Sequence, residues 1–302
     1  MPDRTPKQKN LRVPNRTPDE EPNRTANVTQ DQTSISTPNG MQDQTRNQTS
    51  NRTPEHKRNR TPEQEQYRIP EPEPNHTHIY NHEADRYHQL IAKQPSLLPV
   101  LEAIRPIRGL DVVDVGAGTG RLTLELAPHA RSVVALDASA AMLGVTRRRL
   151  DTAGLASEHV RTAVADHRAL PLADGSADLI VAGWTICYAV HAGETAADAN
   201  LRAILAEMKR VLRPQGTIVI LETMDTGVTA PNPPSSLTGY YEALERQYGF
   251  QHKWIRTDYT FDSPEEAARL TGFFFGAELA KQVRARGLAT VPECAGVWWL
   301  QL

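Results

Sequence analysis

The chain has 302 residues, of which 34 are Lys or Arg and 36 are Asp or Glu, giving a formal net charge of −2; only two are Cys. The balanced charge argues against a broad basic surface for nucleic acid, and two cysteines are too few for a disulfide framework or a cysteine metal cluster. No run approaches the roughly 18 apolar residues of a membrane span, and the first ten residues lack the apolar centre of a signal peptide. We therefore expect a soluble cytoplasmic protein without a bound metal.

The first quarter of the sequence differs in composition from the rest. Residues 1–75 contain no Phe or Trp, and they repeat a short polar unit, as at Asn15–Pro18, Asn51–Pro54 and Asn59–Pro62. A segment with so little apolar surface cannot offset the entropy cost of ordering its backbone. We interpret it as a disordered low-complexity tail or linker, which leaves residues 76–302 for one α/β domain.

The folded part alternates between helical and strand periodicity. The spacing predicts helices at 87–97 and 100–104, a strand at 110–115, a helix at 119–127, a strand at 132–137, a helix after the N-cap Ser139, strands at 160–165 and 178–182, a helix at 196–212 and a strand at 217–222. Strands that alternate with helices of this length are typical of a parallel sheet covered on both faces.

The last third departs from this rhythm. A Pro-rich loop at 230–234 precedes a predicted helix at 236–248 and a strand at 253–261. Ser263, Pro264 and Glu266 form a capping box that opens a helix expected to run to about Arg286. The segment 295–300 is predicted as the final strand.

A glycine turn follows the first strand. The segment Leu110–Gly120 reads LDVVDVGAGTG, with glycines at 116, 118 and 120. Glycine allows positive φ and close approach of the backbone to a ligand, and the N–H groups of the next helix point into the turn. The spacing is not the dinucleotide pattern G-x-G-x-x-G, because Arg121 occupies the third glycine position. We assign no role to Arg121.

This turn resembles the first motif of the class I S-adenosylmethionine-dependent methyltransferases. The segments Pro171–Asp178 (PLADGSAD) and Leu212–Gly216 (LRPQG) are similar to the small-molecule, ubiquinone-biosynthesis-like branch. The resemblance covers about residues 79–223. It implies an α/β fold with a seven-stranded, mostly parallel Rossmann-like sheet whose last strand is antiparallel, and S-adenosyl-L-methionine as the cofactor.

The resemblance also implies a cofactor site. Asp137, at the end of the second strand, is expected to accept the ribose hydroxyls, and Asp166 with the following backbone is expected to contact the adenine. Trp184 is expected near the sulfonium, or alternatively in the core, and Tyr80 is the candidate lid residue. The full set is Tyr80, Asp114, Gly116, Ala117, Gly118, Gly120, Asp137, Ala138, Asp166, His167, Gly183 and Trp184.

The predicted activity is methyl transfer to a small-molecule acceptor by in-line displacement. His191 and Glu222 follow strands four and five and are candidate general bases, although either could be solvated or structurally paired. Aromatic residues form either the acceptor pocket or core: Tyr240, Tyr241, Trp254, Phe273, Phe274, Phe275, Trp298 and Trp299. Two alternatives stay open: a non-catalytic cofactor-binding module or partner subunit, and an NAD-dependent oxidoreductase. The acceptor and the oligomeric state are not specified.

Overall fold

The computed structural model describes residues 74–302. Its strands are β1 (Asp111–Val115), β2 (Ser132–Asp137), β3 (Val160–Val164), β4 (Ala177–Gly183), β5 (Leu212–Thr226), β6 (Gln251–Arg256), β7 (Tyr259–Thr260), β8 (Thr290–Val291) and β9 (Glu293–Gln301). Its helices are α1 (His76–His82), α2 (Ala84–Ile91), α3 (Leu98–Ile104), α4 (Arg121–Leu126), α5 (Ala140–Thr152), α6 (Cys187–Val190), α7 (Ala197–Val211), α8 (Thr238–Arg246), α9 (Pro264–Phe275) and α10 (Ala277–Arg286).

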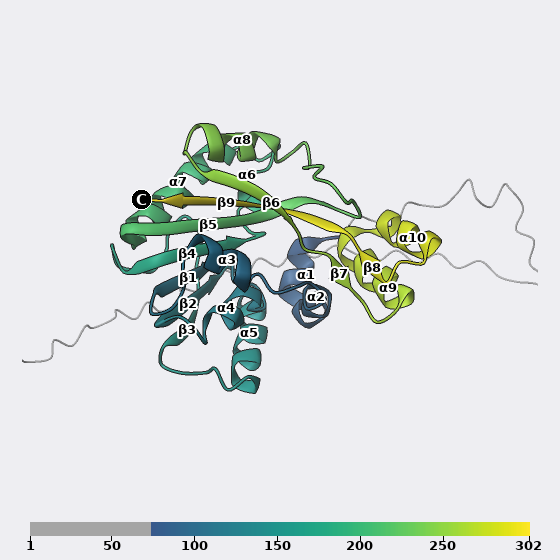
Figure 1. Cartoon of the computed structure of the whole chain (residues 1–302), viewed down its shortest axis with the longest axis horizontal. Coiled ribbons are helices and arrows are strands. Elements are labelled where there is room, and N and C mark those ends of the chain that lie inside the picture. Colours follow the sequence, from purple (N-terminus) through teal and green to yellow (C-terminus); the bar gives the residue numbers. More distant parts are fainter. Residues whose placement is uncertain (1–73) are drawn as a thin grey trace, which may run out of the picture. The chain divides into compact units, whose positions relative to one another are not determined.

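Seven strands form one sheet in the order β3-β2-β1-β4-β5-β9-β6 (Figure 1). The pairs from β3 to β5 are parallel, with Val113 of β1 opposite Val134 of β2. Strand β9 is antiparallel to both of its neighbours, with Ile220 opposite Trp298. The predicted seven-stranded, mostly parallel sheet with an antiparallel last strand is therefore confirmed.

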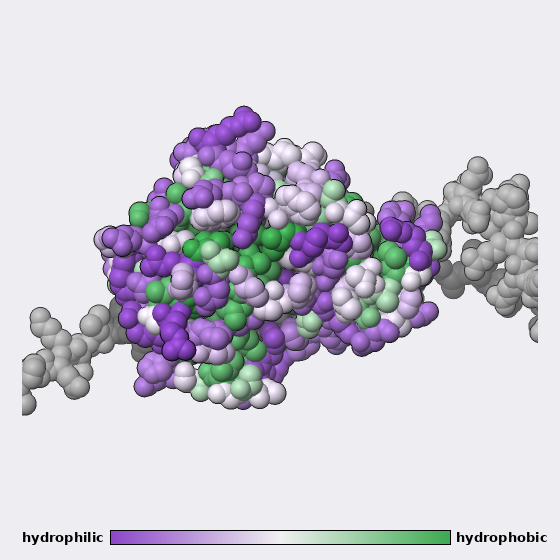
Figure 2. All heavy atoms as spheres, viewed as in Figure 1, coloured by the Kyte–Doolittle hydropathy of each residue, from purple (hydrophilic) through white to green (hydrophobic). Residues whose placement is uncertain are grey.

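Alternate residues of the strands point to opposite faces, and each face has its own core. One face packs Val113, Ile180 and Ile220 against α7 and α8. The other packs Val112, Val181 and the neighbouring strands against α3 and α4. Because both faces of the sheet are buried, the residues that point to either face are apolar. The strand sequences are therefore continuous apolar runs. Figure 2 shows hydrophobic side chains gathered near the middle of one side, with hydrophilic ones toward its edges.

A third cluster lies outside the two sheet cores. It joins α1 and α2 to α9, α10 and the small β7–β8 sheet, through buried residues such as Ile79, Leu90, Leu270 and Val283. The segment that holds α1 and α2 thus meets the segment from β7 to β8 in one subdomain, which we call the terminal subdomain and which Figure 1 shows beside the sheet. Sequence periodicity does not predict this contact, because it joins segments about 180 residues apart.

Several predicted elements are confirmed, and others are wrong in extent. Ser139 caps α5 by accepting from the Met142 N–H, and Ser263 caps α9 through the Glu266 N–H. The strand expected at 253–261 ends at Arg256, and Tyr259 begins β7 in a different sheet. The helix expected to reach Arg286 breaks at Gly276, where φ is 93°, a conformation that no helix residue adopts.

Other differences concern short or extended elements. Sequence periodicity predicts neither α1 nor α6, which has only four residues. Strand β5 begins at Leu212, immediately after α7 ends, so the Arg213–Gly216 breaker lies within the strand. Residues 1–73 of the predicted tail lie outside the described residues, whereas Asn75, at its end, caps α1 by accepting from the His78 N–H. No helix in the described range is long and apolar enough to cross a membrane.

Candidate functional site

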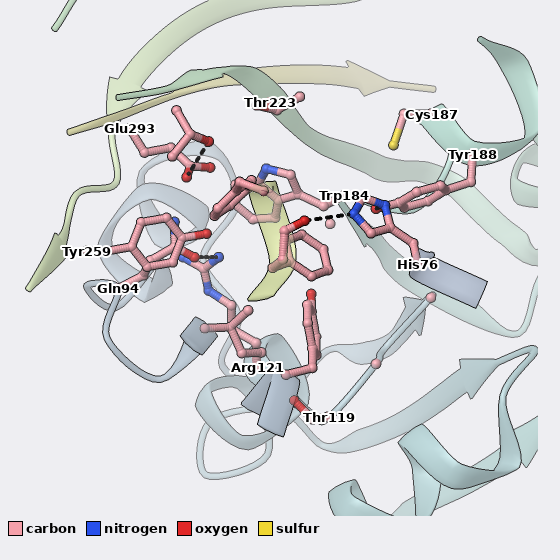
Figure 3. A pocket seen from close by; sticks show the side chains of 18 of the residues that line it. His76, Gln94, Thr119, Arg121, Trp184, Cys187, Tyr188, Thr223, Tyr259 and Glu293 are labelled. Atoms are coloured by element: carbon pink, nitrogen blue, oxygen red, sulfur yellow. Dashed lines mark hydrogen bonds between the residues drawn. The ribbon is translucent and has the colours of Figure 1, made fainter. Parts of the chain in front are cut away.

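A cavity of about 570 Å³, which we call the large cavity, lies at the carboxyl ends of β1, β4 and β5. Helices α1, α2, α9 and α10 line its other walls, so the terminal subdomain closes the edge of the sheet. Two smaller cavities adjoin it through shared lining residues. We call them the Asp137 cavity, of about 300 Å³, and the Asp166 cavity, of about 320 Å³. Figure 3 shows the large cavity from close by.

The glycine turn forms part of the floor of this site. Gly116, Gly118 and Gly120 have φ values of 71°, 57° and 82°, which side-chain-bearing residues rarely adopt. A Cβ on Gly116 would lie 2.1 Å from the Thr185 Oγ1, so glycine is required there by packing as well as by conformation. Gly116, Ala117 and Gly118 all line the large cavity. The turn therefore presents bare backbone to a ligand.

Asp137 lies directly beside the turn. Its Oδ2 accepts the Gly118 N–H at 2.8 Å and its Oδ1 accepts the Ser139 N–H at 2.8 Å. The carboxylate lines the Asp137 cavity together with Ala138. Each carboxylate oxygen can accept more than one hydrogen bond, so Asp137 both orders the glycine turn and keeps acceptor capacity toward the cavity.

Asp114 is buried beneath the same turn. Its side chain accepts from the Thr123 hydroxyl at 2.6 Å, which ties β1 to α4. Burial, with a smaller contribution from the nearby Asp137 charge, raises the pKa of Asp114 to about 7 against the lowering effect of the Thr123 hydrogen bond. Asp114 also lines the large cavity.

Asp166 and His167 line the Asp166 cavity, and His167 reaches the Asp137 cavity as well. Asp166 pairs with Arg168, which donates from its backbone and its guanidinium and lowers the Asp166 pKa to about 2. The His167 Nε2 lies 3.3 Å from the Thr185 Oγ1. Asp166 and His167 follow β3 and lie at the end of the site beyond Asp137.

Gly183 ends β4, Trp184 follows it, and both line the large cavity and the Asp137 cavity. Trp184 has a φ of 51°, unusual for a bulky residue. Its backbone N–H donates to the Leu221 carbonyl at 2.7 Å, which fixes this conformation. Its indole Nε1 is buried and has no hydrogen-bond partner among residues 74–302. Trp184 therefore borders the cavity, although its ring also packs against the core on the α3–α4 face.

Tyr80 on α1 covers the site and is bonded to residues that the sequence did not single out. Its hydroxyl lies 2.6 Å from the Tyr188 hydroxyl, which in turn lies 3.4 Å from the His76 Nδ1. The His76 ring stacks on Phe274 at a centroid distance of 4.4 Å. No sequence signal links His76 to Tyr188, because they lie on α1 and α6 and meet each other and Phe274 of α9 only in the folded chain.

A polar cluster on the opposite side of the cavity was also missed. Arg121 donates from its Nη1 to the Gln94 Oε1 at 2.7 Å, and its guanidinium carbon lies 4.6 Å from the centre of a Trp184 ring. Glu293 is buried and accepts from the Thr226 hydroxyl at 3.2 Å, and Tyr259 lies beside this group (Figure 3). Arg121 directly follows the glycine turn, and this position is a sequence signal that could have identified it as a site residue. No sequence signal pairs Arg121 with Glu293.

The two candidate bases lie elsewhere. Glu222 is fully buried, and its Oε1 accepts the Cys187 N–H at 3.0 Å. His191 is exposed on the loop after α6, where its Nδ1 lies 3.3 Å from the Ala192 carbonyl. Neither lines any of the three cavities. Glu222 is bonded to Cys187, which lines the large cavity, and the role of either residue as a general base stays a prediction.

The aromatic residues separate in the same way. Phe274 and Phe275 line the large cavity. Tyr240, Tyr241 and Trp298 are core residues, with Tyr241 stacked on Trp298 at 4.5 Å, and Trp254 is 47% exposed. Among residues 74–302, no three His, Cys, Asp or Glu side chains are placed to hold a metal ion.

Comparisons with known proteins agree with this architecture. Residues 113–220 match the methyltransferase domain family. Demethylmenaquinone methyltransferase from Clavibacter sepedonicus is 38% identical over 120 residues, which cover 40% of this chain and 44% of that protein. The ubiquinone/menaquinone biosynthesis C-methyltransferase UbiE of Paracoccus denitrificans is 34% identical over 126 residues, covering 41% and 46%. The chain thus spans about half the length of the curated relatives it matches.

The structure is also similar to solved methyltransferases. One is an S-adenosylmethionine-dependent methyltransferase from Aquifex aeolicus, with a TM-score of 0.47, 17% identity and coverage of 72% of this chain and 98% of that one. The family match over residues 113–220 and the strand order support the resemblance of this domain to the class I S-adenosylmethionine-dependent methyltransferases. The resemblance stated from the glycine turn is confirmed.

Proposed function

We propose that residues 76–302 form an enzyme that transfers a methyl group from S-adenosyl-L-methionine to a small-molecule acceptor. The observation that carries the proposal is the bare backbone turn at Gly116–Gly120, which lies beside Asp137 and opens into a cavity of about 570 Å³. When bound, the cofactor supplies an electrophilic methyl group on its sulfonium. The two unpaired thiols, Cys187 and Cys294, fit a reducing cytoplasmic location.

The proposed cofactor site follows the three adjoining cavities. Asp137 would accept the ribose hydroxyls with its remaining lone pairs, and Ala138, Asp166 and His167 would surround the adenine. The other members are Asp114, Gly116, Ala117, Gly118 and Gly120 at the turn, Gly183 and Trp184 at the end of β4, and Tyr80 on the lid. These residues lie along the carboxyl edge of the sheet, from β4 through β1 to β3.

The chain's main contribution to catalysis is positioning. Aligned reactants held near contact distance lower a barrier by about 7–11 kcal/mol relative to free encounter. The walls supplied by Tyr80, Tyr87, Phe274 and Phe275 exclude water and suit a ring-bearing acceptor. The quinone-biosynthesis names of the relatives support an acceptor of this kind.

An acceptor that must lose a proton needs a base within the cavity. We propose Glu293 for this role in place of Glu222 and His191, which do not line the site. Burial raises the pKa of Glu293 to about 7. A carboxylate with this pKa is partly ionised at neutral pH and is basic enough to accept a proton.

The experiment is a calorimetric titration with S-adenosylmethionine and, separately, NAD. We expect binding of the sulfonium cofactor alone, weakened about tenfold or more by Asp137→Asn. The matched control is Asp178→Asn: Asp178 also accepts a backbone N–H, from Asp111, but lies at the amino end of β4. Binding of NAD without S-adenosylmethionine would contradict the proposal. Release of S-adenosylhomocysteine with an acceptor then separates an enzyme from a binding module.

A further inference from the structure

The polar cluster at the cavity wall contains a cation without a counter-ion. Arg121 uses its Nη1 to donate to Gln94, but its Nη2 is buried and has no hydrogen-bond partner within residues 74–302. Arg121 forms no ion pair with a carboxylate of that range, although Glu293 lies near enough to affect its pKa. A buried guanidinium that lacks a counter-ion carries an uncompensated desolvation cost.

A second unpartnered donor belongs to the same stacked pair. The Trp184 ring lies beneath the Arg121 guanidinium, and its Nε1 is likewise buried without a partner in the described chain. Trp184 is held with φ at 51°, so the indole is fixed in an unfavourable backbone conformation rather than free to turn toward water. Two fixed N–H donors, one of them charged, are what a carboxylate or another anionic oxygen requires.

The rest of the cavity wall limits which kind of ligand can supply this anionic oxygen. Tyr259, Phe275 and Leu279 line the cavity near the stacked pair. Burial raises the Glu293 pKa to about 7, so its carboxyl is partly neutral at physiological pH and leaves the Arg121 charge incompletely balanced. The surroundings therefore combine an apolar surface with a local excess of positive charge.

We infer that the methyl acceptor is an apolar, ring-bearing acid whose anionic oxygen is bound by Arg121 and Trp184. This inference rests on the proposed function. The methionine carboxylate of the cofactor has the same chemistry and is the other possible source. The acceptor is favoured because Arg121, Glu293 and Tyr259 line only the large cavity, whereas the Asp137 cavity is lined by none of them.

The test measures binding of 2-naphthoate and of its neutral match, 2-naphthamide, to the full chain saturated with S-adenosylhomocysteine. We expect the naphthoate to bind about tenfold more tightly or better. Arg121→Met should remove this preference, and Trp184→Phe, which keeps an aromatic side chain of smaller size and deletes the N–H, should reduce it several-fold. Lys209→Met, on α7 outside the three cavities, is the control and should leave it unchanged. Equal binding of the two probes, or no binding of naphthoate, would overturn the inference.

A second titration distinguishes the two sources of the carboxylate. S-adenosylhomocysteine carries the methionine carboxylate and 5′-methylthioadenosine lacks it. If Arg121→Met and Arg121→Gln leave both affinities unchanged while abolishing the naphthoate preference, the acceptor supplies the anion. A selective loss of S-adenosylhomocysteine affinity would assign Arg121 to the cofactor and overturn the inference. If Arg121→Met does not fold, Arg121→Gln and Trp184→Phe decide the result. Failure of the unsubstituted protein to bind S-adenosylhomocysteine would instead contradict the proposed function.

Discussion

The two sides of the large cavity are built from different kinds of groups. The side formed by β1, β4 and the glycine turn offers mainly backbone: positive-φ glycines and N–H groups held by Asp137. The side formed by α1, α2, α9 and the start of β9 offers side chains that meet from distant parts of the sequence, such as His76, Gln94 and Glu293. The first side depends on local conformation, whereas the second depends on how the terminal subdomain docks.

The largest effect is expected from Gly116→Ala on the backbone side. The new Cβ would collide with the Thr185 side chain, and alanine disfavours a φ of 71° by about 1–2 kcal/mol. We expect S-adenosylmethionine affinity to fall by about 100-fold or more in a calorimetric titration. Gly109→Ala is the control, since Gly109 has a φ of 76° but no atom within 4 Å of the new Cβ. Equal effects of the two substitutions on affinity would show that the turn does not bind the cofactor.

A second prediction concerns the strand layer beneath the cavity. Burial raises the pKa of Glu222 from 4.5 to about 7, so the folded state holds this proton more tightly than the unfolded state. The contribution of Glu222 to the free energy of unfolding should therefore be largest below pH 4.5. It should decrease as the pH rises to about 7. The loss attributable to Glu222 is about 3 kcal/mol.

Glu222→Gln should remove that part of the pH dependence, measured by urea unfolding at pH 5 and pH 8. The exposed Glu242→Gln is the control and should leave the difference between the two pH values unaltered. Unchanged pH dependence in Glu222→Gln would mean that the carboxyl is not buried in an apolar environment. S-adenosylmethionine affinity should be unaffected, because Glu222 does not line the site.

A smaller effect is expected on the side-chain wall from Tyr80→Phe. The substitution keeps the ring and removes the 2.6 Å hydrogen bond to Tyr188, a loss of about 1 kcal/mol. Cofactor affinity should fall about fivefold. Tyr248→Phe, at the end of α8 away from the cavities, should change nothing. A loss as large as that of Gly116→Ala would mean that the lid, and not the turn, dominates binding.

The smallest effect is expected from deletion of residues 1–73, which should leave cofactor affinity within about twofold of the full chain. Deletion of residues 1–83 provides the contrast, because it also removes α1 with His76 and Tyr80 and should weaken binding about tenfold. Similar affinities of the two truncated proteins would show that α1 is not part of the site.

The sequence alone determined the sheet and the backbone side of the site. The positions of β1 to β5 along the chain, the Ser139 and Ser263 caps and the glycine turn all follow from neighbours within a few residues. Such features are set by local conformation and by short-range periodicity. The position of Asp137 beside the turn was predictable for the same reason, since consecutive parallel strands end at the same edge.

Only the tertiary structure decided the rest. The break at Gly276, the division of the 251–261 segment between two sheets, and the meeting of Gln94, Arg121 and Glu293 depend on the docking of chain segments up to about 200 residues apart. Sequence periodicity placed Glu222 at a strand end but not on a buried face away from the cavities. Backbone geometry is encoded locally, whereas converging side chains are fixed by the packing of the terminal subdomain onto the sheet.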